Sequence, residues 1–142
     1  MTMSTHAFLS SVVEIEIPFQ DVDAMQVVWH GNYFRYFETA RSQLLRTINY
    51  DYTEMLASNY LWPIIGAEVR FVQPLQYRQR VTVQADLVEW ENRLKIDYLI
   101  RDAGSGQRLT TGHTIQCAVD SVTHELQLVS PPILIERLKG YL

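Results

Sequence analysis

The first part of the chain alternates between apolar and polar residues and then changes to the spacing of a helix. Residues 12–18 place three apolar side chains on one face and two glutamates on the other, the pattern of a half-buried strand that ends at Pro18. A loop is predicted over 19–28. Apolar positions then recur every three or four residues, at Tyr33, Phe37, Ala40, Leu44 and Ile48. This spacing predicts a helix over 31–48, and a short helical turn follows over 52–58.

The rest of the chain has the period-two pattern of antiparallel strands. We predict strands at 62–72, 81–87, 94–100, 109–119 and 125–129. In the fourth of these, the alternate residues from Leu109 to Val119 are expected to share one face. Turns at Glu91-Asn92 and 102–106 join the middle strands, and Pro131-Pro132 opens a last helix. One strand, one long helix and four or five further strands predict an α+β fold in which the sheet wraps around the helix.

Length and composition fit a single domain. The chain has 142 residues, of which 47% are apolar, and a chain of this size buries about 70% of its unfolded surface. It therefore needs no disulfide staples, and a disordered regulator is excluded. We predict a flexible N-terminal arm over 1–11 and one domain over 12–142, because no repeat or internal linker interrupts the pattern.

Charge and cysteine content narrow the class of protein further. The net charge of −4 argues against a nucleic-acid partner, which would require a clustered basic excess. Cys117 is the one cysteine and lies in an apolar-alternating run, so we expect a buried thiol in a reducing compartment. No signal peptide and no run of 18 apolar residues is present, and the predicted location is cytoplasmic, without a membrane span.

The densest group of polar residues precedes the long helix, over 20–33. The first turn of a helix has unpaired backbone N–H groups that can stabilise an oxyanion, and a nearby carboxylate can act as a base or nucleophile. Asp23 and His30 lie seven residues apart in this segment and could meet across the loop. The pattern alone also fits turn-capping aspartates and a structural histidine.

Other kinds of site find less support in the sequence. A metal site of Asp21, Asp23 and His30 lacks the further Cys or His ligands that would complete its coordination, so no metal is expected. The sequence contains no nucleophile elbow, phosphate loop or dinucleotide fingerprint, and no organic cofactor is expected. His113 is expected to be a core or interface histidine.

Three short motifs carry a resemblance to a known family. The segments Asp21-Val22-Asp23-Ala24, Val27-Val28-Trp29-His30-Gly31-Asn32-Tyr33 and Phe37-Glu38-Thr39-Ala40-Arg41 resemble the hot-dog fold acyl-CoA thioesterases. The most similar branch is the 4-hydroxybenzoyl-CoA thioesterase group, which includes the thioesterases associated with the Tol-Pal system. The resemblance implies a hot-dog fold, with a long central helix wrapped by five or six antiparallel strands.

The resemblance also implies roles for individual residues. Asp23 matches the catalytic carboxylate, and His30 matches a position whose backbone N–H polarises the thioester carbonyl and whose side chain is implicated in catalysis in the Tol-Pal branch. Trp29 and Gly31 are expected to contribute to substrate binding. The family member with the same Glu89-Trp90 pair has a basic cluster that holds the CoA phosphates, and Arg93 and Lys95 retain that character here.

The chain departs from the family pattern at two positions and in its charge. Gln26 replaces a usual glycine, and Phe19 replaces a tyrosine with a proposed catalytic role. The smaller basic cluster leaves either CoA or an acyl carrier protein as the thioester's carrier.

The predicted activity is hydrolysis of an acyl-CoA or acyl-carrier-protein thioester by a homodimer or homotetramer. Two alternatives remain open. One is a hot-dog hydratase or dehydratase that acts on enoyl or hydroxyacyl thioesters, and the other is a non-catalytic acyl-binding or scaffold protein.

Overall fold

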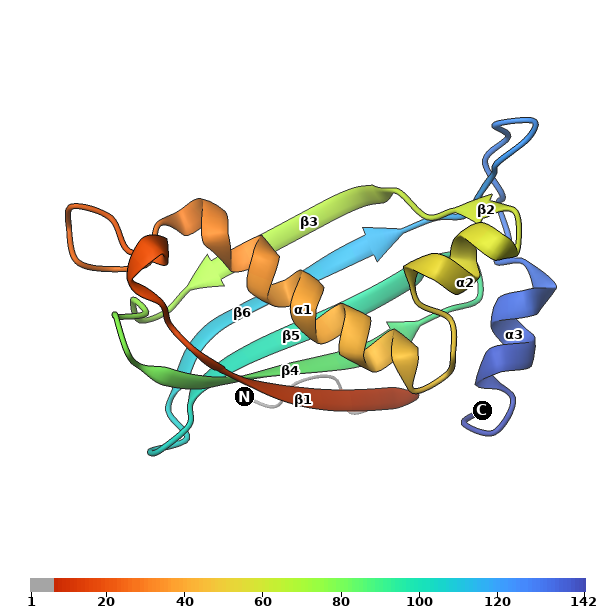
Figure 1. Cartoon of the computed structure of the whole chain (residues 1–142). Helices are drawn as coiled ribbons and strands as arrows, with labels where there is room; N and C mark the ends of the chain where they lie inside the picture. Colours follow the sequence, from red (N-terminus) through yellow and green to blue (C-terminus); the bar gives the residue numbers. More distant parts are fainter. Residues whose placement is uncertain (1–6) are drawn as a thin grey trace.

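A five-stranded antiparallel sheet is the framework of the molecule. The computed structural model describes residues 7–142, and the sheet has the strand order β1-β4-β5-β6-β3 (Figure 1). The strands are β1 (Leu9–Glu16), β3 (Ile64–Phe71), β4 (Arg80–Glu89), β5 (Leu94–Asp102) and β6 (Arg108–Gln116). Because the order places β3 last, β3 and β1 are the two edges of the sheet.

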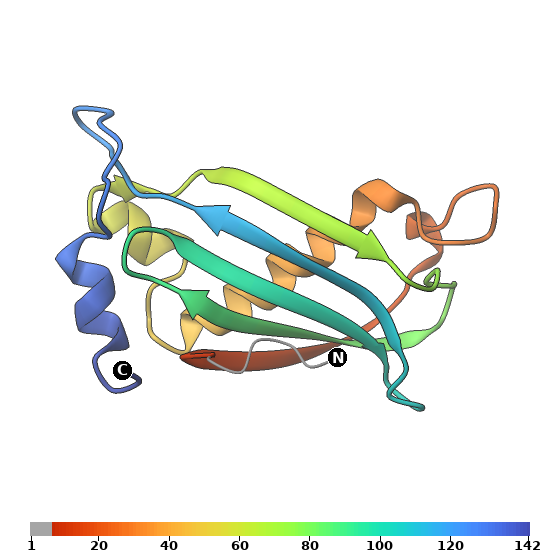
Figure 2. The same cartoon turned by 180° about the vertical axis from the view of Figure 1, so that it is seen from behind.

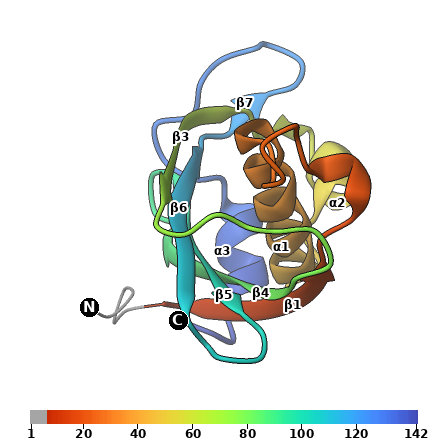
Figure 3. The same ribbon diagram turned by 90° about the vertical axis from the view of Figure 1, so that its left-hand side faces the viewer.

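One face of the sheet carries the long helix α1 (Tyr33–Arg46), which is preceded by a 3₁₀ turn over His30–Asn32. The end view in Figure 3 shows the sheet curving around this helix, and Figure 2 shows that no helix of residues 7–142 covers the opposite face. The short helix α2 (Tyr52–Ala57) and the helix α3 (Pro132–Leu138) lie at one end, beside a two-stranded sheet of β2 (Tyr60–Leu61) and β7 (Val119–Asp120). This arrangement confirms the predicted α+β fold of a helix wrapped by an antiparallel sheet.

The core lies between α1 and the sheet. Phe37 stacks on Tyr98 of β5, with 4.3 Å between ring centroids, and both rings are fully buried. Gly112 of β6 makes this packing possible, because a Cβ there would lie 2.6 Å from the Phe37 ring. Burial of these large side chains contributes roughly 1.5–3 kcal/mol each. The helix is therefore fixed across the middle of the sheet, and its N-terminal end is held near the loop that follows β1.

Two predicted boundaries near the ends need correction. The strand β1 begins at Leu9, so residues 9–11 are not part of an arm; Leu9 pairs with Leu87 of β4 and is buried. The predicted flexibility of residues 1–6 concerns a segment outside the described residues. At the other end, the predicted strand 125–129 forms only an isolated bridge between Leu126 and Val119.

The face of β6 that carries Thr111, His113 and Ile115 is turned away from α1. The side chains that share the helix side of the sheet are Thr110, Gly112, Thr114 and Gln116, in register with Ile100, Tyr98, Ile96 and Leu94 of β5. The alternation therefore grouped Thr111, His113 and Ile115 correctly, and their shared face is the outer one. Leu109 and Cys117, at the two ends of the run, are nevertheless buried. Small and hydroxyl-bearing residues are needed on the inner face because the aromatic rings of α1 and β5 occupy the space in front of it.

The outer face of the sheet is polar, whereas the β3 edge is apolar. A row of side chains in register crosses the outer face from strand to strand, through Ser10, Asp86, Asp97, His113 and Glu68. Burial, the largest influence, raises the pKa of Asp97. Ile64, Ile65, Phe71 and Val72 are all exposed at or beside the β3 edge. Four large apolar side chains without cover therefore lie together at this edge.

Candidate active site

The loop between β1 and α1 folds into a small hairpin that carries Asp23. Its N–H donates to the Val27 carbonyl and its own carbonyl accepts from Gln26, both at 2.9 Å. Gln26 closes the turn in the left-handed region, with φ of 66°, a conformation that glycine adopts freely and that costs another residue about 1–2 kcal/mol. The family's usual glycine at this position fits that backbone. Gln26 keeps the turn and adds a side chain to the wall beside Asp23.

The Asp23 side chain is half-buried and held by its own turn. Its Oδ1 accepts the N–H of Met25 at 2.8 Å, which leaves Oδ2 without a protein donor among residues 7–142. Asp23 faces a hollow of about 780 Å³ that is also lined by Phe19, Gln26 and Tyr77. One carboxylate oxygen is thus fixed while the other can face a substrate. The turn-cap role and a catalytic role are therefore compatible in one residue.

Tyr77 is a residue of this hollow that the sequence pattern did not indicate. Its ring packs edge-to-face on Phe19, with 5.7 Å between centroids, and Phe19 is 71% exposed. Although Phe19 lacks the hydroxyl of the family's tyrosine, Tyr77 brings a phenol to the same hollow from the turn after β3. Only the fold places these two residues together.

Asp21 is a buried anchor for the start of α1. It is 2% exposed, and its carboxylate accepts hydrogen bonds from Arg35 at 2.5 Å and from the Tyr36 hydroxyl at 2.6 Å. Its backbone carbonyl accepts from the N–H of Trp29 and from the Asn32 side chain. Burial first, and then the hydrogen bond to Asp21, raises the pKa of Tyr36 above its ordinary range. Asp21 therefore links the loop to the start of α1 through its carboxylate and also through its backbone carbonyl.

The turn before α1 presents two free backbone donors. Within the described part of the chain, the N–H groups of His30 and Gly31 donate no hydrogen bond. Gly31 is required sterically, because a Cβ there would lie 2.2 Å from the Trp29 ring. The imidazole of His30 is exposed and lies against the same ring, with 5.1 Å between centroids. The N–H groups and the His30 ring are therefore accessible at the start of the helix.

Asp23 and His30 line neighbouring hollows of a single chain. His30 borders a smaller hollow of about 210 Å³ with Tyr33 and Phe71, and Val27 belongs to both hollows. No hydrogen bond or ion pair links the two residues in the described chain. The residues 7–142 also contain no group of three His, Cys, Asp or Glu side chains that could hold a metal ion.

Arg93 and Lys95 lie at the opposite end of the sheet from Asp23. They are in the β4–β5 hairpin, next to the end of β4, whereas Asp23 follows the end of β1, which pairs with the start of β4 (Figure 1). The Arg93 guanidinium is paired with Glu89 through contacts of 2.9 and 3.1 Å, and this pairing raises the pKa of Arg93. A single chain therefore does not bring the two predicted parts of the substrate site together.

A long helix wrapped by a five-stranded antiparallel sheet is the hot-dog fold of the thioesterases. A family model described as the thioesterase-like superfamily matches residues 17–136, and the chain belongs to that family. In the described residues, no helix is long and apolar enough to cross a membrane.

Individual relatives agree with this assignment. The DHNA-CoA thioesterase of Staphylococcus aureus superposes with a TM-score of 0.82 at 25% identity, over 92% of this chain and 89% of that one. A 4-hydroxybenzoyl CoA thioesterase shares the fold, with a TM-score of 0.78 at 18% identity over 91% and 98% of the two chains. The acyl-CoA thioesterase YbgC of Haemophilus influenzae is 36% identical over 47 residues, which are 33% of this chain and 35% of that one. Matches to curated relatives span 35% to 68% of their lengths.

Proposed function

We propose that this chain hydrolyses acyl-CoA or acyl-carrier-protein thioesters. The observation that carries the proposal is the half-buried Asp23 carboxylate, held by one oxygen in the loop that leads to two free N–H groups at the start of α1. A nucleophile source and a main-chain oxyanion donor are the two elements that acyl transfer needs. Membership of the thioesterase-like superfamily supports the same reaction.

The chemistry follows from the charge that develops on the thioester. The Asp23 carboxylate attacks the carbonyl carbon or takes a proton from the water that attacks it. The carbonyl oxygen gains negative charge, which the N–H groups of His30 and Gly31 stabilise. The C–S bond then breaks and the thiolate leaves. Where Asp23 itself attacks, water then hydrolyses the anhydride that joins Asp23 to the acyl group and restores the carboxylate. In either route the elements of water end as the hydroxyl of the free acid and the proton of the released thiol.

A panel assay separates this reaction from its two rivals. The protein is incubated with acyl-CoA esters of different length and with an enoyl-CoA, while free thiol and double-bond absorbance are followed together. Thiol release from several esters supports hydrolysis. Loss of the double bond without thiol release would instead support a hydratase, and binding without either change would support a scaffold protein.

We expect the protein to be at least a homodimer that pairs through β3. This strand is an unpaired edge flanked by exposed Ile64, Ile65, Phe71 and Val72, and edges of this kind pair readily with another strand. Light scattering at micromolar concentration should give at least twice the monomer mass. The double variant Ile65→Lys/Phe71→Lys should lower that mass, whereas Val12→Lys on the opposite edge should not. A monomeric wild-type protein would contradict this proposal.

In a β3-paired dimer, Arg93 and Lys95 of one copy can contact a substrate bound at Asp23 of the other. Antiparallel pairing turns the second copy end for end, so that the Arg93 end of one chain lies on the same side of the dimer as the Asp23 end of the other. The basic pair can then hold the CoA phosphates for the second copy's carboxylate.

Replacing Arg93 with Ala should raise KM for acyl-CoA about 3- to 10-fold and leave kcat nearly unchanged. The effect is modest because the guanidinium is exposed, and it falls on KM because the contact is similar in the ground and transition states. The control is Arg80→Ala, which removes an exposed arginine paired with Glu14 and Glu16. Equal KM values for wild type and Arg93→Ala would assign phosphate binding to other residues.

A further inference from the structure

The segment that follows β6 forms a short hairpin that projects past the β3 edge of the sheet. This C-terminal hairpin, residues 119–129, begins with β7 and turns back toward α3, and Figures 1 and 2 both show it extending beyond β3. Its exposed side chains include four large apolar ones, which are 54–80% exposed: Val122, Leu126, Leu128 and Val129. Apolar side chains gathered on one projecting element are typical of a contact surface.

Hydrogen bonds within the C-terminal hairpin hold it in one shape. The Asp120 carboxylate accepts the N–H groups of Thr123 and Val122 at 2.9 and 2.8 Å, and these bonds lower the pKa of Asp120. The Asp120 N–H donates across the hairpin to the Glu125 carbonyl at 2.9 Å. The apolar side chains are therefore presented in fixed positions by an ordered element.

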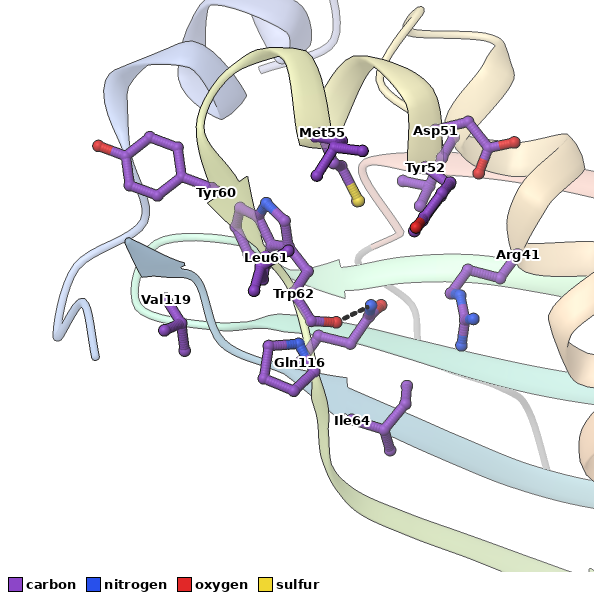
Figure 4. Close-up of a pocket in the computed structure, with 13 residues that line it drawn as sticks. Arg41, Asp51, Tyr52, Met55, Tyr60, Leu61, Trp62, Ile64, Gln116 and Val119 are labelled. Atoms are coloured by element: carbon purple, nitrogen blue, oxygen red, sulfur yellow. Dashed lines mark hydrogen bonds between the residues drawn. The ribbon is translucent and has the colours of Figure 1, made fainter. Parts of the chain in front are cut away.

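The base of the hairpin is built into the end of the sheet. Val119 of β7 pairs with Leu61 of β2, and both line a cavity of about 370 Å³ bordered by α1 and α2 (Figure 4). Gln116, at the end of β6, also lines this cavity, and its side-chain amide donates to the Trp62 carbonyl at 2.7 Å. That bond links β6 to the segment between β2 and β3, so the direction of the hairpin relative to the β3 edge is fixed.

The loop around Asp23, at the opposite end of the molecule, exposes a second group of apolar side chains. Phe19 is 71% exposed, Met25 80% and Tyr77 51%, and all three line the hollow of Asp23. The backbone N–H of Met25 holds the Asp23 carboxylate, while the Met25 side chain faces solvent. A surface that packs on the Met25 side chain therefore restrains the turn that positions Asp23.

Antiparallel pairing of β3 brings the two apolar groups together. Strands that pair in this way within one sheet are related by a two-fold axis perpendicular to the sheet. An axis through the middle of β3, between Ala67 and Glu68, places Ile64 of one copy opposite Phe71 of the other. Figure 1 shows the Asp23 loop and the hairpin at opposite ends of the β3 edge, and Figure 3 shows both toward that edge. The rotation therefore carries the Asp23 loop of one copy to the C-terminal hairpin of the other.

The charges of the two surfaces are complementary. Glu125 is exposed in the C-terminal hairpin, and Arg78 is exposed in the turn that brings Tyr77 to the hollow. Within residues 7–142, the side chains of Glu125 and Arg78 make no hydrogen bond or ion pair. Contact between copies gives each of them a counter-charge, so a second copy of this chain fits the hairpin better than an apolar surface without charge does.

We infer that the C-terminal hairpin of one copy docks on the Asp23 loop of the other and positions the turn that carries Asp23. The apolar side chains of the hairpin pack on Met25 and Phe19, so the turn is restrained from outside its own chain. The inference rests on the proposed function and on β3 pairing. It adds a contact that a single chain cannot make, because the Asp23 loop and the hairpin lie at opposite ends of α1 (Figure 1).

Cross-linking between copies tests the docking without any substrate. Leu128→Cys and Met25→Cys are combined in a Cys117→Ala background, because Leu128 and Met25 are each 80% exposed and their replacement leaves the core intact. A short bis-maleimide should convert most of the protein to a covalent dimer on a denaturing gel. Each single variant should stay monomeric on that gel. Val12→Cys combined with Leu128→Cys should also stay monomeric, because Val12 lies on the opposite edge of the sheet.

Steady-state activity tests the effect of docking on Asp23. Leu128→Asp places a charge in the apolar contact, and kcat should fall about 10-fold, because a small displacement of a catalytic group is costly. The mass from light scattering should stay that of the wild type, since β3 still pairs. The control is Ile135→Asp, which replaces an exposed apolar side chain of α3 outside the C-terminal hairpin and should leave kcat unchanged.

The outcomes separate this inference from the proposed function. A protein that hydrolyses thioesters but gives no covalent dimer overturns the docking and leaves hydrolysis standing, and a monomeric wild type overturns the docking equally. A covalent dimer without hydrolysis of any thioester supports the docking and overturns the proposed function. A covalent dimer with equal kcat for wild type and Leu128→Asp supports the docking and overturns its role in positioning Asp23.

Discussion

Replacing Asp23 with Asn should lower kcat at least about 100-fold, the low end for a positioned acid or base. Asn keeps the size of the side chain and an oxygen that can accept the Met25 N–H, so the turn should survive while the charge and basicity are lost. The measurement is steady-state thiol release, with circular dichroism to verify folding. His30→Ala should cost less, because the oxyanion donor assigned here is the main chain.

Asp102→Asn is the control for Asp23→Asn. Asp102 also accepts backbone N–H groups within its own turn, from Gly104 and Ser105, but lies outside the hollow that Asp23 lines. Its replacement should leave kcat unchanged. If Asp23→Asn retains more than a tenth of wild-type turnover, Asp23 is only a turn acceptor and the proposed mechanism is wrong.

Replacing Asp21 with Ala should lower the free energy of unfolding by about 2–4 kcal/mol. The change removes a buried carboxylate and leaves the Tyr36 hydroxyl buried without its acceptor, and breaking such pairs is strongly destabilising. This loss of unfolding free energy is at the lower end for buried pairs, because the Arg35 side chain is half exposed and water can solvate its guanidinium once Asp21 is gone. Urea denaturation measures the change.

Asp21→Asn distinguishes the charge from the hydrogen bond. Asn still offers Tyr36 an oxygen but has no charge for Arg35, so its destabilisation should fall between wild type and Asp21→Ala. A loss below about 1 kcal/mol for Asp21→Ala would show that the contacts of Asp21 are dispensable.

The periodicity of the chain predicted the elements well because helix and strand patterns are local. The helix predicted over 31–48 is α1 with its 3₁₀ turn, and Pro132 lies in the first turn of α3 as expected. Alternation grouped the residues of β6 into two faces, but it could not tell which of the two meets the helix. That choice depends on Phe37, which approaches Gly112 from a distant part of the chain.

The candidate site was predicted only in part, for the same reason. The loop around Asp23 was found because its residues are adjacent in sequence and resemble a family motif. Asp21 was interpreted as a turn residue because its partners are not adjacent in sequence. Arg35 and Tyr36 lie 14 and 15 positions away, on α1. Tyr77 and Gln116 join their hollows through long-range packing, and nothing in their local sequence distinguishes them.

The strand order also determines how late in synthesis the sheet can close. The sheet neighbour of β3 is β6, and β4 and β5 lie between them in the sequence. As the chain leaves the ribosome, β3 therefore appears early and must wait, unpaired, until the last long strand has been made. Closing such non-local pairs is the slow step in folding a sheet. Because β3 is also the proposed pairing edge, the surface offered to a second copy should be among the last parts of the sheet to form.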